Sequence, residues 1–152
     1  MAIELKPVDF SAHYQIEEIH KMVFHFYEEY DNNHVISIEN INKTIQHLIS
    51  HPDHGSFRCI YLNDILVGYS ILINYWSNEY GGIIVFIDEL YIKPAFRNQG
   101  IGNQFLNMLE LKFPNINTFA LEVSPSNEHA IGLYLKNGFT QNKNNTLIKV
   151  LS

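Results

Sequence analysis

A short polar stretch between two apolar segments has a spacing that suits anion binding. It reads Arg97-Asn98-Gln99-Gly100-Ile101-Gly102 and follows the apolar run Ile83 to Ile92, which is typical of a central strand. Apolar residues then recur at helical intervals as far as Leu109. Two glycines let an anion approach the backbone, and a helix start offers unpaired N–H groups and the positive end of its dipole. The stretch therefore predicts a strand, a loop for a diphosphate and a helix.

Two better-known nucleotide loops do not match this stretch. A P-loop needs Lys and then Ser or Thr after its last glycine, whereas Asn103 and Gln104 follow Gly102. The dinucleotide fingerprint needs three glycines, and this loop has Gly100 and Gly102 alone. Both are excluded.

A second pattern stands further along the chain, at Asn127, Ala130, Tyr134 and Gly138-Phe139. The two patterns together resemble the GCN5-related N-acetyltransferase (GNAT) family. Its acetyl-CoA signature is Arg or Gln, two residues, Gly, one residue, then Gly or Ala; its last helix carries Asn, Ala and Tyr before Gly-Phe. The resemblance covers essentially the whole chain and is most specific from Asp88 to Phe139.

The order of expected elements also resembles that family. We expect an α/β fold with an α+β mixed sheet, the GNAT-like acyl-CoA N-acyltransferase fold, with a central mixed sheet of six or seven strands and about four helices. A single domain over residues 1–152 is expected. The predicted segments are strands at 3–8, 57–62, 65–76, 83–92 and 118–123, helices at 12–30, 38–50, 101–112 and 127–136, and one or two final strands within 140–151.

Charge and composition narrow the class of partner. Ten Lys and Arg stand against sixteen Asp and Glu, for a formal charge of −6 without a basic cluster. This argues against nucleic acid and suits a cationic substrate. The chain start lacks the pattern of a secretory signal and no run is long enough to span a bilayer, so we expect a cytoplasmic protein without a membrane partner.

The resemblance implies acetyl-CoA as co-substrate. Main-chain groups of the strand before the loop would pair with the pantetheine arm, and the loop would hold the diphosphate. Asn127 would contact the arm's amides; the alternative is a plain helix cap, and both roles can coexist. The expected cofactor-binding residues are Leu90, Tyr91, Ile92, Arg97, Asn98, Gln99, Gly100, Ile101, Gly102 and Asn127.

Acetyl transfer to an amine needs a proton donor for the leaving thiolate and a proton acceptor for the amine. The resemblance implies Tyr134 as the general acid, against the alternative of a packed core tyrosine. Asp88 and Glu89 are the favoured bases, with Glu122 as a further candidate. Strand alternation puts Asp88 and Glu89 on opposite faces unless a bulge intervenes.

The acceptor is harder to infer. The chain resembles the small-molecule branch, notably diamine acetyltransferases, and in that family Glu28 and Glu29 would lie in the acceptor wall. The expected function is acetyl-CoA-dependent N-acetyl transfer, by direct attack on the thioester, to a primary amine of a small cation such as a polyamine or aminoglycoside. The alternatives are a solvated helix end at these residues, a non-catalytic acetyl-CoA sensor, or a protein or peptide N-acetyltransferase. The family also suggests a homodimer.

Eight histidines raise the question of a metal site. His47 and His51 stand one helical turn apart, with His54 close by. No Glu accompanies them in a zincin arrangement, and Pro52 ends the helix. We therefore expect solvated surface histidines and no metal.

Overall fold

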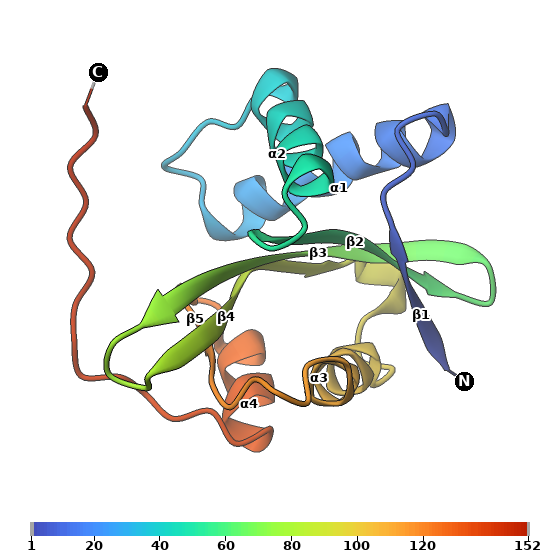
Figure 1. Ribbon diagram of the computed structural model, residues 1–152. Coiled ribbons are helices and arrows are strands. Elements are labelled where there is room, and N and C mark those ends of the chain that lie inside the picture. The colour runs from blue at the N-terminus through green and yellow to red at the C-terminus, as the bar shows by residue number, and fades with distance from the viewer. Residues whose placement is uncertain (1, 152) are drawn as a thin grey trace.

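A mixed β-sheet lies between two pairs of helices. The computed structural model describes residues 2–151, and within them the sheet has five strands in the spatial order of the sequence (Figure 1). The first four strands pair antiparallel, and the last pair is parallel. The strands are β1 (Ile3–Pro7), β2 (Gly55–Leu62), β3 (Ile65–Ser77), β4 (Gly82–Ile92) and β5 (Phe119–Leu121).

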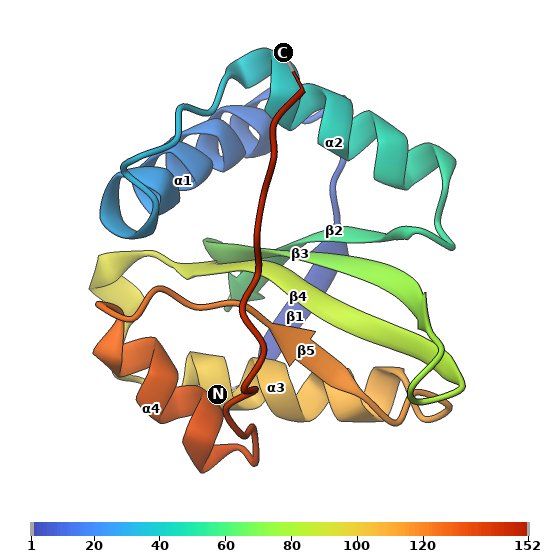
Figure 2. The same ribbon diagram turned by 90° about the vertical axis from the view of Figure 1, so that its left-hand side faces the viewer.

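The helices divide between the two faces of the sheet. Helices α1 (His13–Tyr30) and α2 (Ile38–Ser50) cover one face. Helices α3 (Ile101–Lys112) and α4 (Glu128–Lys136) lie on the other (Figures 1 and 2). A single 3-10 turn, Pro94–Phe96, leads from β4 into the loop before α3. The mixed α/β architecture predicted from the sequence is confirmed.

Each face of the sheet has its own hydrophobic core, as expected for strands covered on both sides. The core under α1 and α2 includes the fully buried Ile19, Ile45 and Tyr69. The core under α3 includes the fully buried Val85 and Phe105. Strand β4 contributes to both, so its register determines which of its side chains faces which pair of helices.

Local sequence signals account for several helix ends. The Ser37 hydroxyl accepts a hydrogen bond from the Asn40 amide at 3.1 Å, which caps α2. Asn127 Oδ1 accepts from the Ala130 amide at 3.2 Å and caps α4. Gly138 follows α4 with φ +91°, the left-handed conformation that glycine tolerates.

Strand β4 contains one residue more than its partner β3 at Asp88. Ile71 pairs with Glu89 while Leu72 pairs with Ile87, so Asp88 is the extra residue of a bulge. Ile87 accordingly lies in the α3 core, and Glu89 is bonded to tyrosines of the opposite side. Without the bulge, residues two apart on a strand would share a face.

The number of strands is smaller than expected, because residues 140–151 form none among the described residues. This tail leaves α4 and runs along the outside of the molecule (Figures 1 and 2), and the Thr146 hydroxyl donates to the Glu122 carboxylate at 3.2 Å. Its apolar side chains Leu147, Ile148, Val150 and Leu151 are exposed. The homodimer that the family suggests stays a prediction.

No helix among residues 2–151 combines the length and the apolar character that crossing a membrane requires.

Candidate active site

A cleft of about 280 Å³ opens between the end of β4, the loop before α3, and α4. Most of the residues that sequence analysis assigned to the cofactor line it, together with Tyr134. Gln99 does not: its side chain is exposed and donates to the Ala95 carbonyl oxygen at 3.4 Å. The predicted residues along the cleft are Leu90, Tyr91, Ile92, Arg97, Asn98, Gly100, Ile101, Gly102, Asn127 and Tyr134.

The cleft exists because β4 and β5 separate. In the described part of the chain, β5 pairs with β4 only at Val85, Phe86 and Ile87, just before the bulge. The segment of β4 from Asp88 to Ile92 keeps β3 on one side and has the cleft where β5 would continue. An extended ligand could therefore add to this open edge through main-chain hydrogen bonds.

The loop before α3 has the backbone shape of an anion cradle. Asn98 and Gly100 both have positive φ, +62° and +79°, which turns successive N–H groups toward one side. The first bond of the helix runs from the Gln104 amide to the Gly100 carbonyl at 3.0 Å, and no side chain caps this end. The amides of the first helical turn are thus available to an anion such as a diphosphate.

The two glycines of the loop serve different purposes. Nothing lies within 4 Å of the place where a Cβ of Gly100 would stand, so its positive φ is what requires glycine. A Cβ on Gly102 would come 2.7 Å from Leu133 Cδ2 of α4. Gly102 therefore allows α3 and α4 to pack closely along the cleft.

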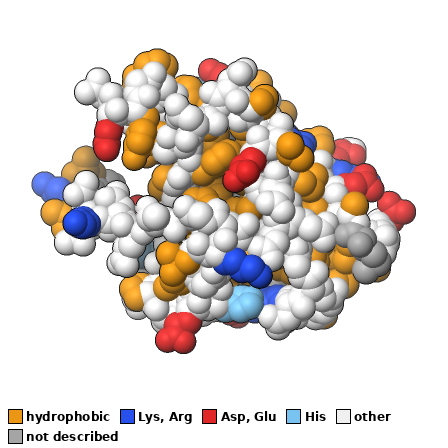
Figure 3. Space-filling view, turned by 90° about the horizontal axis from the view of Figure 1, so that it is seen from below, with side chains coloured by type: hydrophobic (Ala, Val, Ile, Leu, Met, Phe, Trp, Pro, Cys, Tyr) orange, Lys and Arg blue, Asp and Glu red, His pale blue; other side chains and the backbone are white. Residues whose placement is uncertain are grey.

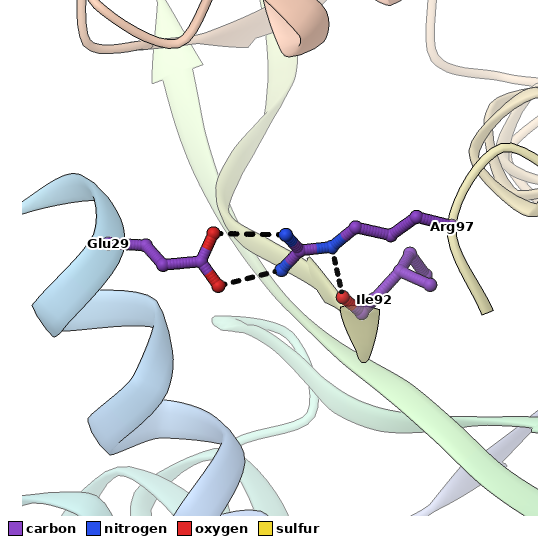
Figure 4. A network of polar contacts seen from close by, with 3 residues as sticks. All are labelled: Glu29, Ile92 and Arg97. Atoms are coloured by element: carbon purple, nitrogen blue, oxygen red, sulfur yellow. Dashed lines mark hydrogen bonds and ion pairs between the residues drawn. The ribbon is translucent and has the colours of Figure 1, made fainter. Parts of the chain in front are cut away.

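Arg97 is bonded to Glu29 of α1 and to the end of β4 (Figure 4). Its two terminal nitrogens donate to the Glu29 carboxylate at 3.0 and 2.9 Å, and its Nε donates to the Ile92 carbonyl oxygen at 2.8 Å. The guanidinium also lies 5.2 Å from the centre of the Tyr91 ring. Hydrogen bonding to Arg97 lowers the pKa of Glu29. Glu29 thus joins the end of α1 to the loop, while Glu28 is exposed.

Tyr134 reaches the cleft from the last turns of α4. Its ring packs edge-on against Phe139, with centroids 5.5 Å apart. Burial, and then the neighbouring Tyr30, raise the pKa of Tyr134 to about 12. With this pKa the hydroxyl is protonated at neutral pH. No group among residues 2–151 accepts its hydrogen bond, so its proton can be donated to a ligand in the cleft.

A second, smaller pocket of about 130 Å³ lies on the other face of β4, under α1 and α2. Asp88 and Glu89 both line it, because the bulge prevents them from facing opposite sides. The sequence predicted opposite faces unless a bulge intervenes, and the structure has that bulge. The remaining walls are Val23, Tyr27, Ile36, Ile41, Thr44, Phe57 and Ile71.

Glu89 is the buried acid of this pocket. Tyr27 Oη donates to its Oε2 at 2.9 Å, and Tyr69 Oη donates to its Oε1 at 2.7 Å. Burial raises the pKa of Glu89 to about 7. The two phenol hydrogen bonds lower this pKa, and the charge of Asp88 raises it further. The pKa of Asp88 is also raised, by burial and then by the Glu122 carboxylate. A carboxyl group that titrates near neutral pH can accept a proton from an amine.

Some lining residues were not anticipated from the sequence. His129, Leu133 and Lys136 of α4 border the large cleft, and Tyr30 closes its α1 side. The three α4 residues follow the helical spacing that Ala130 and Tyr134 also share, so this spacing could have identified them. Tyr27 and Tyr69 carried no such signal, because their partner Glu89 lies 62 and 20 residues away in sequence.

The face that carries α3 and α4 is seen in Figure 3. Hydrophobic side chains are exposed on it. Leu111 of α3 and Leu135 of α4 are among the exposed large hydrophobic residues. Lys and Arg side chains lie apart from one another in this view and form no continuous patch.

A family model matches most of the chain. The family model described as Acetyltransferase (GNAT) family matches residues 12–139. No curated protein sequence matches.

Solved structures share the fold at low sequence identity. A "possible acetyltransferase" from Clostridium difficile 630 is 19% identical, with 100% of both chains covered and a TM-score of 0.79. An aminoglycoside N-acetyltransferase in complex with CoA is 12% identical, covering 97% of this chain and 94% of that one, with a TM-score of 0.75. A ribosomal-protein-alanine N-acetyltransferase from Brucella melitensis biovar Abortus 2308 is 14% identical, covering 98% and 100%, with a TM-score of 0.73.

The Glu29–Arg97 pair predicts how the cleft responds to a charge change. In Glu29→Gln, Arg97 keeps its positive charge without a neutralising carboxylate, so an anionic ligand should bind more tightly. We expect the dissociation constant of CoA, measured by calorimetry at low salt, to fall about fivefold, because two unit charges near 4 Å interact by about 1 kcal/mol in water. High salt should remove the difference.

Glu28→Gln is the matched control, since Glu28 is the neighbouring acid on the same helix and Arg97 bonds to Glu29 instead. Equal CoA affinity in the wild type and both variants would mean that Arg97 takes no part in anion binding.

Proposed function

The chain belongs to the GNAT family of acetyltransferases, and we propose that it transfers the acetyl group of acetyl-CoA to the primary amine of a small cationic molecule. The observation that carries this proposal is the arrangement around β4. The open edge and anion cradle lie on one side of the strand, and the pocket of Asp88 and Glu89 lies on the other. The bulge at Asp88 lies in the part of β4 that separates the cleft from this pocket.

The large cleft suits acetyl-CoA. The open edge of β4 matches a pantetheine arm, and the left-handed turns at Asn98 and Gly100 match a diphosphate. Bound acetyl-CoA supplies a thioester carbonyl for attack. Asn127 caps α4 through its Oδ1, which leaves its Nδ2 as a donor to the arm. Main-chain N–H groups between Leu90 and Ile92 are the proposed donors to the developing oxyanion.

The small pocket suits the end of an alkylammonium group. Its walls are mostly apolar and two carboxyl groups stand at β4, so a short carbon chain with a terminal cation fits its chemistry. A volume of about 130 Å³ limits the buried part to a short arm. Diamines, polyamines and aminoglycosides that bear an aminoalkyl group are the proposed acceptors. Glu29 is paired with Arg97, so recognition of the cation rests on Asp88 and Glu89.

An amine screen tests the proposal. Acetyl-CoA is incubated with diamines, aminoglycosides, and peptides with free N-termini or lysines, and thiol release is measured. We expect release with short primary alkylamines and a raised Michaelis constant for the amine in Asp88→Asn. Peptide-only activity would favour the protein acetyltransferase alternative. Saturable acetyl-CoA binding without thiol release from any amine would favour a non-catalytic module.

Tyr134 is the proposed general acid, which donates its phenol proton to the leaving thiolate. Tyr134→Phe keeps the ring and its packing against Phe139 and removes the proton. We expect the turnover number to fall by roughly 100-fold, the low end for general acid catalysis, because a phenol with a pKa of about 12 is a weak acid. The dissociation constant of acetyl-CoA should stay the same. Unchanged turnover would remove Tyr134 from the mechanism.

Glu89 is the proposed general base. Its carboxylate must be ionised to accept a proton, so kcat/KM should rise with pH through about 7 and then level off. In Glu89→Gln this inflection should disappear, and kcat/KM at pH 8 should fall by roughly 100-fold or more. The amine's own ionisation should remain as a higher inflection in every variant.

Asp88→Asn distinguishes the two acids. It should keep the inflection of Glu89, moved to lower pH because the Asp88 charge helps to raise the pKa of Glu89. A profile that loses its inflection in Asp88→Asn and keeps it in Glu89→Gln would make Asp88 the base.

A further inference from the structure

Three histidines meet where α2 ends and the chain turns into β2. One ligating nitrogen from each of His47, His51 and His54 lies within 4.8 Å of the others. The rings pack on one another with centroids 4.5 to 5.0 Å apart. All three side chains are exposed, so the burial of apolar surface does not explain why they gather. We propose that they form a binding site for a transition-metal cation of the Zn²⁺ type, separate from acetyl transfer.

The backbone under the cluster is held on several sides. The His51 amide donates to the His47 carbonyl oxygen at 2.9 Å, and the His54 amide donates to the His51 carbonyl oxygen at 2.9 Å. The Asn74 amide of β3 donates to the His54 carbonyl oxygen, also at 2.9 Å. A Cβ on Gly55 would stand 2.0 Å from the Leu72 carbonyl oxygen, so only glycine lets the turn lie this close to β3. The three Cα positions are therefore preorganised.

A hydrogen bond to the backbone favours a metal-binding tautomer of His51. His51 Nδ1 lies 3.0 Å from the His47 carbonyl oxygen, which can only accept, so Nδ1 carries the proton. His51 Nε2 is then left with a free lone pair, in the manner of metal-ligating histidines whose other nitrogen donates to a carbonyl. His47 Nε2 and His54 Nδ1 lie 2.9 Å apart, so one must donate to the other. A cation would take both lone pairs once the donating ring moves its proton to its far nitrogen.

The distances fit a small tetrahedral ion. Nitrogen ligands at about 2.0–2.1 Å from Zn²⁺ stand roughly 3.3 Å from one another in a tetrahedron. The separations in the cluster, 2.9 Å for one pair and up to 4.8 Å overall, lie on both sides of that value. The proposed site therefore requires the exposed rings to rotate toward a common centre. Imidazole prefers Zn²⁺, Cu²⁺ and Ni²⁺, whereas Mg²⁺ and Ca²⁺ prefer oxygen ligands.

A cation here would tie two elements together. His47 belongs to the last turn of α2, and His54 immediately precedes β2. Helix α2 also supplies Ile41 and Thr44 to the wall of the small pocket, and β2 supplies Phe57. Metal binding should therefore stabilise the folded chain, because the three ligands are brought together only there.

Zinc titration of the metal-free full chain, without an affinity tag, tests the proposal. We compare the wild type with the triple variant His47→Gln, His51→Gln, His54→Gln, and with His13→Gln, an exposed histidine outside the cluster, as the control. We expect calorimetry to show one Zn²⁺ per chain in the wild type and His13→Gln, with roughly 100-fold or greater weakening in the triple variant. The melting temperature of the first two should rise by several degrees with Zn²⁺ and stay unchanged with Mg²⁺.

Two results would overturn the inference. One is the absence of Zn²⁺ binding by the wild type at zinc concentrations up to about 1 mM, because structural zinc sites bind at far lower concentrations. The other is equal binding by the triple variant, which would place the metal elsewhere. If the triple variant does not fold, the single variant His54→Gln replaces it: its zinc affinity should fall by at least tenfold, and wild-type affinity there would contradict the proposal equally.

Discussion

One extra residue in a strand determines where the chemistry of this protein can take place. Asp88 interrupts the alternation of β4, so that Ile87 faces the α3 core and Glu89 faces α1 and α2. The parallel partner β5 pairs no further than Ile87. The same irregularity thus ends the strand pairing, opens the cleft beside Leu90 to Ile92, and puts two carboxyl groups into one pocket. A bulge at such a place is a functional feature of a sheet.

Placing Glu89 in that pocket raises a problem of charge, since a buried carboxylate is costly unless it is hydrogen-bonded. The hydroxyls of Tyr27 in α1 and Tyr69 in β3 donate to this carboxylate and offset part of that cost. The remaining penalty leaves a pKa of about 7, so neither protonation state dominates at neutral pH. On the other side of β4, the charge of Arg97 is met by Glu29. Helix α1 therefore contributes to both sites: Tyr27 bonds to Glu89 in the small pocket, and Glu29 bonds to Arg97 beside the large cleft.

Local signals in the sequence predicted much of this. The Arg97 to Gly102 loop, the Ser37 and Asn127 caps and the turn at Gly138 depend on neighbouring residues, and each lies where the sequence indicated. The partners of Glu29 and Glu89 could not be predicted, because they depend on how α1 settles on a sheet whose register includes a bulge. Final strands were wrongly expected in residues 140–151: this segment forms none among the described residues, although the outer edge of β5 is unpaired there.

The histidines show the same division between local and long-range information. Their spacing in sequence lacks the pattern of a known metal motif. Helix α2 ends just before Pro52, with His51 stacked on His47 one turn earlier. That helix end is what brings His54 back toward His47, since the turn folds over and Asn74 of β3 holds it there. A break in regular structure thus gathers ligands that a longer helix would have spread apart. The bulge in β4 gathers its two acids for the same reason: both sites lie where a regular backbone pattern stops.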